Sequence, residues 1–123
     1  MAGLGELERS IMEQLWKSDD ALTANEVRER LADPADASRT PATTTVLTVL
    51  SRLERKGFVA RARETRPHRY HALLSRAEHT AELMHEVLSS SSDRDAALAR
   101  FVGTVTDREA RTLHRLLDEL VRR

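Results

Sequence analysis

A row of small hydroxyl side chains that leads into a group of cations is the most distinctive chemical feature of this sequence. It lies in "TPATTTVLTVLSRLERKG", residues 40–57, where Thr40 and Pro41 predict the start of a helix and Gly57 predicts its end. At about 100° per residue, one side of this helix carries Thr44, Thr48, Ser51 and Arg55. The opposite side is apolar and consists of Val46, Val49, Leu50 and Leu53.

Such a polar side suits insertion into the major groove of DNA. Short hydroxyl side chains allow close approach to base edges, and threonine methyl groups can contact the thymine methyl group. Arginine and lysine side chains at the end of the helix and beyond it can bind phosphates. The residues predicted to contact DNA are Thr43, Thr44, Thr45, Leu47, Thr48, Ser51, Arg52, Arg55, Lys56, Arg61, Arg63 and Arg66. An exposed helix without a binding role is the alternative interpretation of the hydroxyl groups alone.

The charges of the chain are segregated although their sum is zero. Residues 1–38 carry four basic and nine acidic side chains, a net charge of −5. Residues 39–74 carry eight basic and two acidic ones, a net charge of +6, and residues 75–123 carry eight and nine, a net charge of −1. A basic block in a neutral chain indicates a polyanionic partner that is bound by one face. The alternative is a solvated basic surface that the acidic first third balances.

The segments around the central helix predict the order helix, helix, helix and β-hairpin. A first helix is predicted by apolar residues at helical spacing, namely Leu4, Leu7, Ile11, Leu15 and Trp16. Thr23 and Glu26 form a capping box for a second helix, and "ALT", residues 21–23, can form a short strand before it. "FVARARE" and "HRYHAL", residues 58–64 and 68–73, predict two strands around the turn "TRP". This order predicts a mostly α fold with a β-hairpin wing, a winged helix-turn-helix domain over residues 1–74.

Residues 75–123 are predicted to be a helical dimerisation region. Capping boxes at Ser75 with Glu78 and at Thr106 with Glu109 mark helix starts, and "SSSSD" interrupts the helical pattern. These helices contain few aromatic residues and cannot bury their apolar stripes on one another alone. A second copy of the chain is the simplest cover for them. The residues predicted to form the dimer are Met84, Leu88, Phe101, Leu113, Leu116, Leu117, Leu120 and Val121.

Several other classes of function are not supported by the sequence. There is no cysteine, glycine-rich phosphate loop or nucleophile elbow, so we expect neither an enzyme nor a cofactor. His68 and His71 point to opposite faces of the hairpin, so no metal site is expected. The sequence shows neither a signal peptide nor a run of 18 apolar residues, so we expect a cytoplasmic protein without membrane insertion.

Three segments, "LERSIMEQLW", "TTTVLTVLSRLERKGFV" and "RPHRYHAL", together resemble the penicillinase repressor (BlaI/MecI) family of bacterial transcriptional regulators. The resemblance covers nearly the whole chain. It implies a homodimeric winged-helix repressor that binds a dyad-symmetric DNA operator and dimerises through its C-terminal helices. Family members often carry a basic residue where Leu47 stands here. The absence of cysteine argues against the copper-responsive branch of the family.

The resemblance also implies a switch. Many relatives are inactivated by proteolysis in the C-terminal arm when a membrane sensor detects a β-lactam, which implies a sensor-linked protease as a partner and a role in antibiotic resistance. The corresponding bond joins Arg100 to Phe101, where relatives typically have Asn before the Phe.

The rival interpretation is a winged-helix module that binds another protein and does not bind DNA specifically. Such modules usually lack a basic wing beside a third helix that ends in cations.

Overall fold

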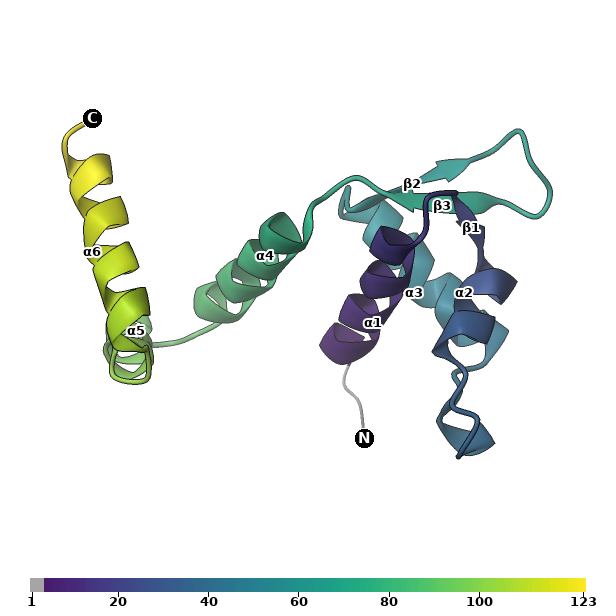
Figure 1. Cartoon of the computed structure of the whole chain (residues 1–123), viewed down its shortest axis with the longest axis horizontal. Helices are drawn as coiled ribbons and strands as arrows, with labels where there is room; N and C mark the ends of the chain where they lie inside the picture. Colours follow the sequence, from purple (N-terminus) through teal and green to yellow (C-terminus); the bar gives the residue numbers. More distant parts are fainter. Residues whose placement is uncertain (1–3) are drawn as a thin grey trace. The chain divides into compact units, whose positions relative to one another are not determined.

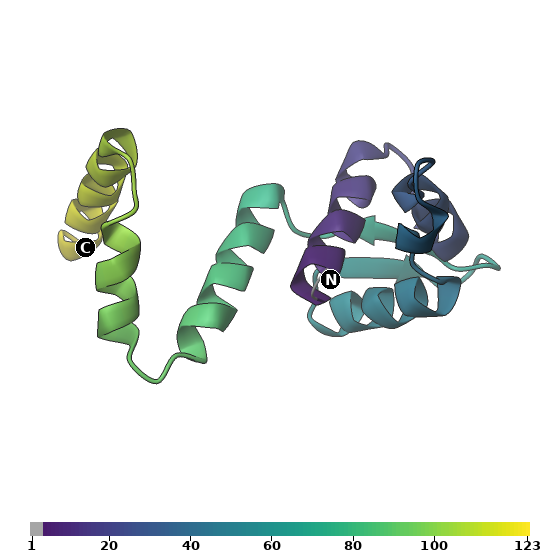
Figure 2. The same cartoon turned by 90° about the horizontal axis from the view of Figure 1, so that it is seen from below.

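The computed structural model describes residues 4–123, which divide into an N-terminal unit that ends at Leu83 and a C-terminal unit, Met84–Arg123 (Figures 1 and 2). The N-terminal unit holds α1 (Leu4–Lys17), β1 (Leu22–Thr23), α2 (Ala24–Leu31), the 3-10 helix η1 (Ala37–Arg39), α3 (Thr43–Arg55), β2 (Val59–Ala62) and β3 (Arg69–Ala72). The helix α4 (Arg76–Ser89) begins in this unit, and α5 (Arg94–Val102) and α6 (Asp107–Val121) follow in the other.

Three helices and a small sheet form the core of the N-terminal unit. The strands lie in the order β1-β3-β2, all antiparallel, and Tyr70 of β3 lies between Leu22 of β1 and Arg61 of β2. Side chains from all of these elements form one core, whose members are Ile11, Met12, Leu15, Leu22, Ala24, Val27, Val46, Val49, Leu50, Leu53, Phe58, Val59 and Tyr70. The β2–β3 loop extends beyond the ends of its strands as the wing (Figure 1). The predicted winged helix-turn-helix fold and its minor first strand are therefore confirmed.

The helix ends are set by local hydrogen bonds. In the capping box of α2, the Thr23 backbone N–H donates to Glu26 Oε1 at 2.9 Å and the Glu26 N–H donates to Thr23 Oγ1 at 3.1 Å. The backbone N–H of Thr23, and then its hydroxyl, lower the pKa of Glu26. At the C-terminal end of α3, the N–H groups of Gly57 and Phe58 donate to the carbonyls of Glu54 and Leu53, respectively. These two bonds make a Schellman motif, for which Gly57 adopts a φ of 81°.

The predicted start of α3 was wrong by two residues. Thr40 and Pro41 lie outside the helix, which begins at Thr43 after Ala42. Thr40 instead closes η1, because its N–H donates to the Ala37 carbonyl, and its hydroxyl accepts from the Asp33 N–H at 3.4 Å. The Pro41 carbonyl accepts a bond from Arg28 Nε at 3.0 Å, which ties the loop to α2.

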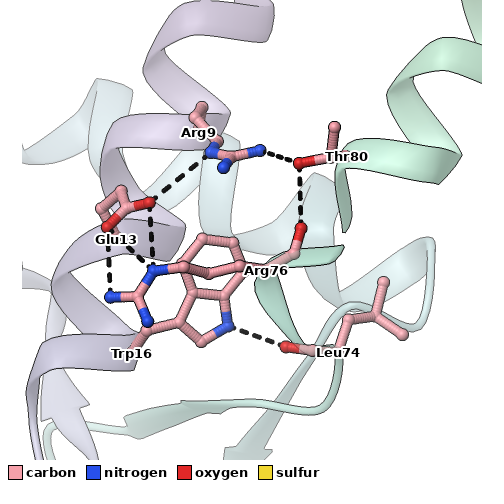
Figure 3. A network of polar contacts seen from close by, with 6 residues as sticks. All are labelled: Arg9, Glu13, Trp16, Leu74, Arg76 and Thr80. Atoms are coloured by element: carbon pink, nitrogen blue, oxygen red, sulfur yellow. Dashed lines mark hydrogen bonds and ion pairs between the residues drawn. The ribbon is translucent and has the colours of Figure 1, made fainter. Parts of the chain in front are cut away.

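The first turns of α4 are fixed to α1 in a way that the sequence did not predict (Figure 3). The guanidinium groups of Arg9 and Arg76 lie 5.5 and 5.3 Å from the ring centre of Trp16, whose Nε1 donates to the Leu74 carbonyl at 2.7 Å. Arg76 also pairs with Glu13 at 3.3 Å, and Arg9 donates to the Thr80 hydroxyl. These contacts make the start of α4 part of the N-terminal unit.

His79 of α4 completes this attachment. It is fully buried and meets the rings of Trp16 and Phe58 edge-on, at 5.7 and 5.4 Å between ring centres. Helical spacing also predicts an apolar stripe on this helix, which includes Ala77, Ala81 and Met84, and these three residues are exposed. The face of α4 that contacts α1 is thus a different one, and it is built from aromatic and polar contacts.

The C-terminal unit has no core of its own. None of its residues 84–123, all of which the structure describes, is buried. The helices themselves are well delimited, since Thr106 and Glu109 form the predicted capping box of α6 with bonds of 2.9 and 3.1 Å. No helix in residues 4–123 has the length and apolar character needed to cross a membrane.

Gly57 offers a direct test of the Schellman motif. A Cβ at this position would meet no atom within 4 Å, so Gly57→Ala adds only the backbone cost of a positive φ. We expect a loss of about 1 kcal/mol in the free energy of unfolding, measured by urea denaturation. Gly5→Ala is the matched control: the same change in α1, also without a contact within 4 Å, should not lower stability. Equal effects of the two substitutions would contradict this explanation.

Candidate nucleic-acid interface

The polar side of α3 faces solvent, as the helical spacing predicted. Its exposed members are Thr44, Thr45, Leu47, Thr48, Ser51 and Arg55, while Thr43 and Arg52 are half-buried. The opposite side, Val46, Val49, Leu50 and Leu53, is at most 1% exposed. Burial of this apolar side fixes the rotation of the helix about its axis, so the hydroxyl groups point outward.

Two of the threonine hydroxyls already donate hydrogen bonds within the protein. Thr48 Oγ1 donates to the Thr44 carbonyl at 2.9 Å, and Thr43 Oγ1 donates to Asn25 Oδ1 at 3.2 Å. Each hydroxyl has a single proton, so toward a ligand these two groups can accept but not donate. Asn25, at the start of α2, belongs to this surface and was not among the predicted residues. Only the fold brings it to α3, so no local sequence signal identifies it.

Two arginines of the wing share one carboxylate. Arg61 and Arg63, two residues apart, both pair with Glu54 at the end of α3, at 3.4 and 3.7 Å. The side chain of Arg63 is 70% exposed, whereas that of Arg61 is 22% exposed. Period-two alternation predicts that the two arginines share a side of the strand, but it does not identify Glu54 as their partner. Arg66, at the tip, is exposed and lies 3.1 Å from His68 Nε2.

Lys56 has a second role beside the predicted one. Its Nζ lies 3.3 Å from Oε1 of Glu8, a carboxylate of α1 that is 3% exposed, and 5.6 Å from the Phe58 ring centre. A buried carboxylate without a cation would be costly, so Lys56 stabilises the contact between α1 and the end of α3. The predicted cations that project most openly are therefore Arg55, Arg63 and Arg66.

A hollow of about 220 Å³ separates α3 from the wing. Its lining includes Thr43, Leu47 and Ser51 of α3, Asn25 of α2, and Arg61 and His68 of the wing. Ala24 and Pro67 also line it, so its walls combine apolar surface with hydroxyl, amide, imidazole and guanidinium groups. Helix, hollow and wing thus combine a surface for base edges with groups that can bind a sugar-phosphate strand.

The electrostatics of the wing act on His68. Partial burial lowers the pKa of this imidazole, and the guanidinium groups of Arg61, Arg66 and Arg63 lower it further, while Glu54 acts in the opposite direction. These effects together favour the neutral form of His68 over the protonated one, compared with an isolated imidazole.

Comparison with known proteins agrees with this geometry. Residues 4–119 match the penicillinase repressor family. The chain belongs to this family. It is 42% identical over 120 residues to "Transcriptional regulator BlaI" of Mycobacterium tuberculosis, in both strain CDC 1551 and strain H37Rv. The aligned region covers 95% of this chain and 84% of each relative. It is thus a transcriptional regulator and not an enzyme.

Weaker similarities extend to solved structures. One is MepR, a transcription regulator of the Staphylococcus aureus multidrug efflux pump MepA, at 16% identity and a TM-score of 0.42, over 93% of this chain and 76% of that one. Another is a MarR family protein from Bacillus stearothermophilus, at 23% identity and a TM-score of 0.44, over 94% and 71% of the two chains.

The charge arrangement in the wing predicts that two substitutions shift the pKa of His68 in opposite directions. Arg66→Gln removes a cation beside His68 and should raise the pKa of its imidazole, because the protonated form is then repelled less. Glu54→Gln removes the one carboxylate that favours protonation and should lower the same pKa. The measurement is an NMR titration of the His68 ring protons in both variants and the unaltered chain. Shifts of the same sign in both variants would contradict the arrangement.

Proposed function

We propose that this regulator is a sequence-specific DNA-binding repressor that acts as a homodimer on a dyad-symmetric operator. The observation that carries the proposal is the exposed hydroxyl face of α3 beside a wing with exposed arginines. A helix-turn-helix presents such a helix to the major groove. Membership in the penicillinase repressor family supports a role of this kind, and the cytoplasm is its proposed location.

The two parts of the surface have different tasks in this proposal. Arg55, Arg63 and Arg66 bind phosphates, which are the same at every site and position the protein without selecting a sequence. Thr44, Thr45, Thr48 and Ser51 face base edges, where a lost contact affects one sequence more than another. The paired cations Lys56 and Arg61 contribute mainly by holding α3 and the wing in place.

Substitutions in the two parts should therefore differ in kind. Arg63→Ala or Arg66→Ala should weaken binding to operator and random duplexes alike and reduce the salt slope by about 1 for each lost phosphate contact. Thr44→Ala should weaken operator binding by about 1–3 kcal/mol and leave random DNA nearly unaffected. Fluorescence anisotropy over a range of salt concentrations measures both effects. Arg111→Ala, in α6, is the control for loss of an exposed arginine.

Two results would count against this division. Equal losses on operator and random DNA from Thr44→Ala would contradict base readout. Binding that does not change between low and physiological salt would contradict the electrostatic part and favour the protein-binding alternative.

The homodimer is proposed because the C-terminal unit cannot cover its apolar side chains. Leu116, Leu117 and Leu120 of α6 are 48%, 59% and 60% exposed, and Phe101 of α5 is 45% exposed. With Met84, Leu88, Leu113 and Val121 they form the surface that we call the apolar arm face. Exposed apolar side chains at helical spacing, as on α6, mark an interface. A two-fold pair presents two α3 helices about one DNA turn apart, or a multiple of it.

The apolar arm face can be tested in the full-length chain. Leu116→Glu combined with Leu120→Glu should yield monomers, because two charges would have to be buried in the interface. Operator affinity should fall by about 10²–10⁴-fold as the tethering of two half-sites is lost. Arg111→Glu, on the opposite side of α6, adds a carboxylate without touching this face and should stay dimeric. A dimer that survives the double substitution in analytical ultracentrifugation would exclude this interface.

The bond between Arg100 and Phe101 is the proposed point of inactivation by a sensor-linked protease of the β-lactam response. It lies in α5, a helix of nine residues without a buried side chain. Little packing would be lost if this helix opened locally to admit a protease. A cut there separates α6 from the winged helix and removes most of the apolar arm face, so repression would end through loss of avidity.

A further inference from the structure

Leu47 is an apolar side chain in the middle of a surface that is otherwise polar. In the part of the N-terminal unit whose side chains the structure describes, the exposed large apolar residues are Leu47, at 41%, and Leu73, at 54%. Leu73 follows β3, whereas Leu47 lies on α3 between Thr43, Thr44, Thr48 and Ser51. A leucine cannot form hydrogen bonds with base edges or phosphates, so its partner in a DNA complex must be apolar.

The hydrogen bonds around Leu47 make this part of α3 more apolar than its sequence indicates. The hydroxyl protons of Thr43 and Thr48 are both used within the protein, at 3.2 and 2.9 Å. These two side chains can still offer a methyl group and an acceptor to a ligand. Leu47 and its neighbours therefore form a small patch that favours an apolar contact over a donated hydrogen bond.

The hollow beside Leu47 indicates what lies next to this patch. Arg61, His68 and Asn25 line the same hollow, and Arg63 and Arg66 lie in the same wing. The guanidinium, imidazole and amide groups on this side of the hollow suit the backbone of a DNA strand between α3 and the wing. Leu47 lies on the side of α3 that lines the hollow, so it would then face the major-groove edges of the bases in that strand. The one apolar group that bases present in the major groove is the C5-methyl group of thymine.

We infer that Leu47 is a specificity-determining residue that selects a thymine in each half-site through contact with its methyl group. This rests on the proposed function. Burial of one methyl group corresponds to about a fourfold change in affinity for each half-site. The contact requires no hydrogen bond, so a base that keeps the pairing of thymine but lacks the methyl group should be bound less well.

Deoxyuridine substitution tests the inference with the full-length chain. The preferred duplex is first selected from random sequences, and each thymine is then replaced by uracil, which removes only the methyl group. We expect one thymine in each half-site at which uracil weakens binding by about fourfold. Leu47→Ala should bind the thymine and uracil duplexes equally, and on the uracil duplex it should match the unaltered chain within about twofold.

The control separates Leu47 from apolar surface in general. Leu73→Ala, the same change at the other exposed leucine, should keep the full preference for thymine over uracil. Alanine favours the helix at position 47, and circular dichroism verifies that Leu47→Ala is folded.

Two results would overturn the inference. The first is a selected duplex in which no replacement of thymine by uracil weakens binding, or in which Leu47→Ala is as sensitive to that replacement as the unaltered chain. The proposed function then stands, and only the role of Leu47 is contradicted. The second is an absence of any selected sequence, which would overturn the proposed function together with the inference.

Discussion

Burial of the apolar side of α3 is the constraint on which the rest of this structure depends. Val46, Val49, Leu50 and Leu53 pack against α1, α2 and the sheet, and each such side chain contributes about 1.5–3 kcal/mol when fully buried. Together they allow only one rotation of the helix about its axis. That rotation exposes the threonines and Leu47, so the surface proposed to read DNA is a direct result of how the core is filled.

The polar contacts around the core hold the flanking parts to this helix. Glu8 and Lys56 join α1 to the end of α3, Glu54 joins the same end to the wing, and the Schellman motif at Gly57 sets the direction in which the chain enters β2. These contacts use charges that would otherwise be available to phosphates. In this way the basic block of residues 39–74 is divided between cations that stabilise the fold and cations that remain open to a ligand.

The two units meet their stability requirements differently. The N-terminal unit has a continuous core and, through Trp16 and His79, includes the first turns of α4. The C-terminal unit is helical but has no buried residue, and its apolar side chains would be covered only in the proposed dimer. This difference is the reason that dimerisation and DNA binding can be tested separately, with substitutions in α6 and in α3.

The sequence by itself determined the features that depend on neighbours along the chain. Periodicity identified the helices and both sides of α3, the three capping boxes marked helix starts, and alternation identified the wing, because all of these patterns repeat within a few residues. The same segments carried the resemblance to the penicillinase repressor family, which the comparisons confirmed. The roles of Thr44, of the apolar arm face and of the Arg100–Phe101 bond stay predictions.

Only the tertiary structure decided how individual side chains are used. Lys56 meets Glu8, 48 positions away, and Thr43 meets Asn25, 18 positions away, so no local pattern could indicate that these groups are engaged. Burial of His79 against Trp16 and Phe58 likewise depends on α4, α1 and the connection between α3 and β2. The helix α3 starts at Thr43 and not near Thr40, because Thr40 forms hydrogen bonds with Ala37 and Asp33 in the preceding loop. Contacts between distant residues depend on the folded arrangement of the elements, and a periodic sequence pattern contains no information about them.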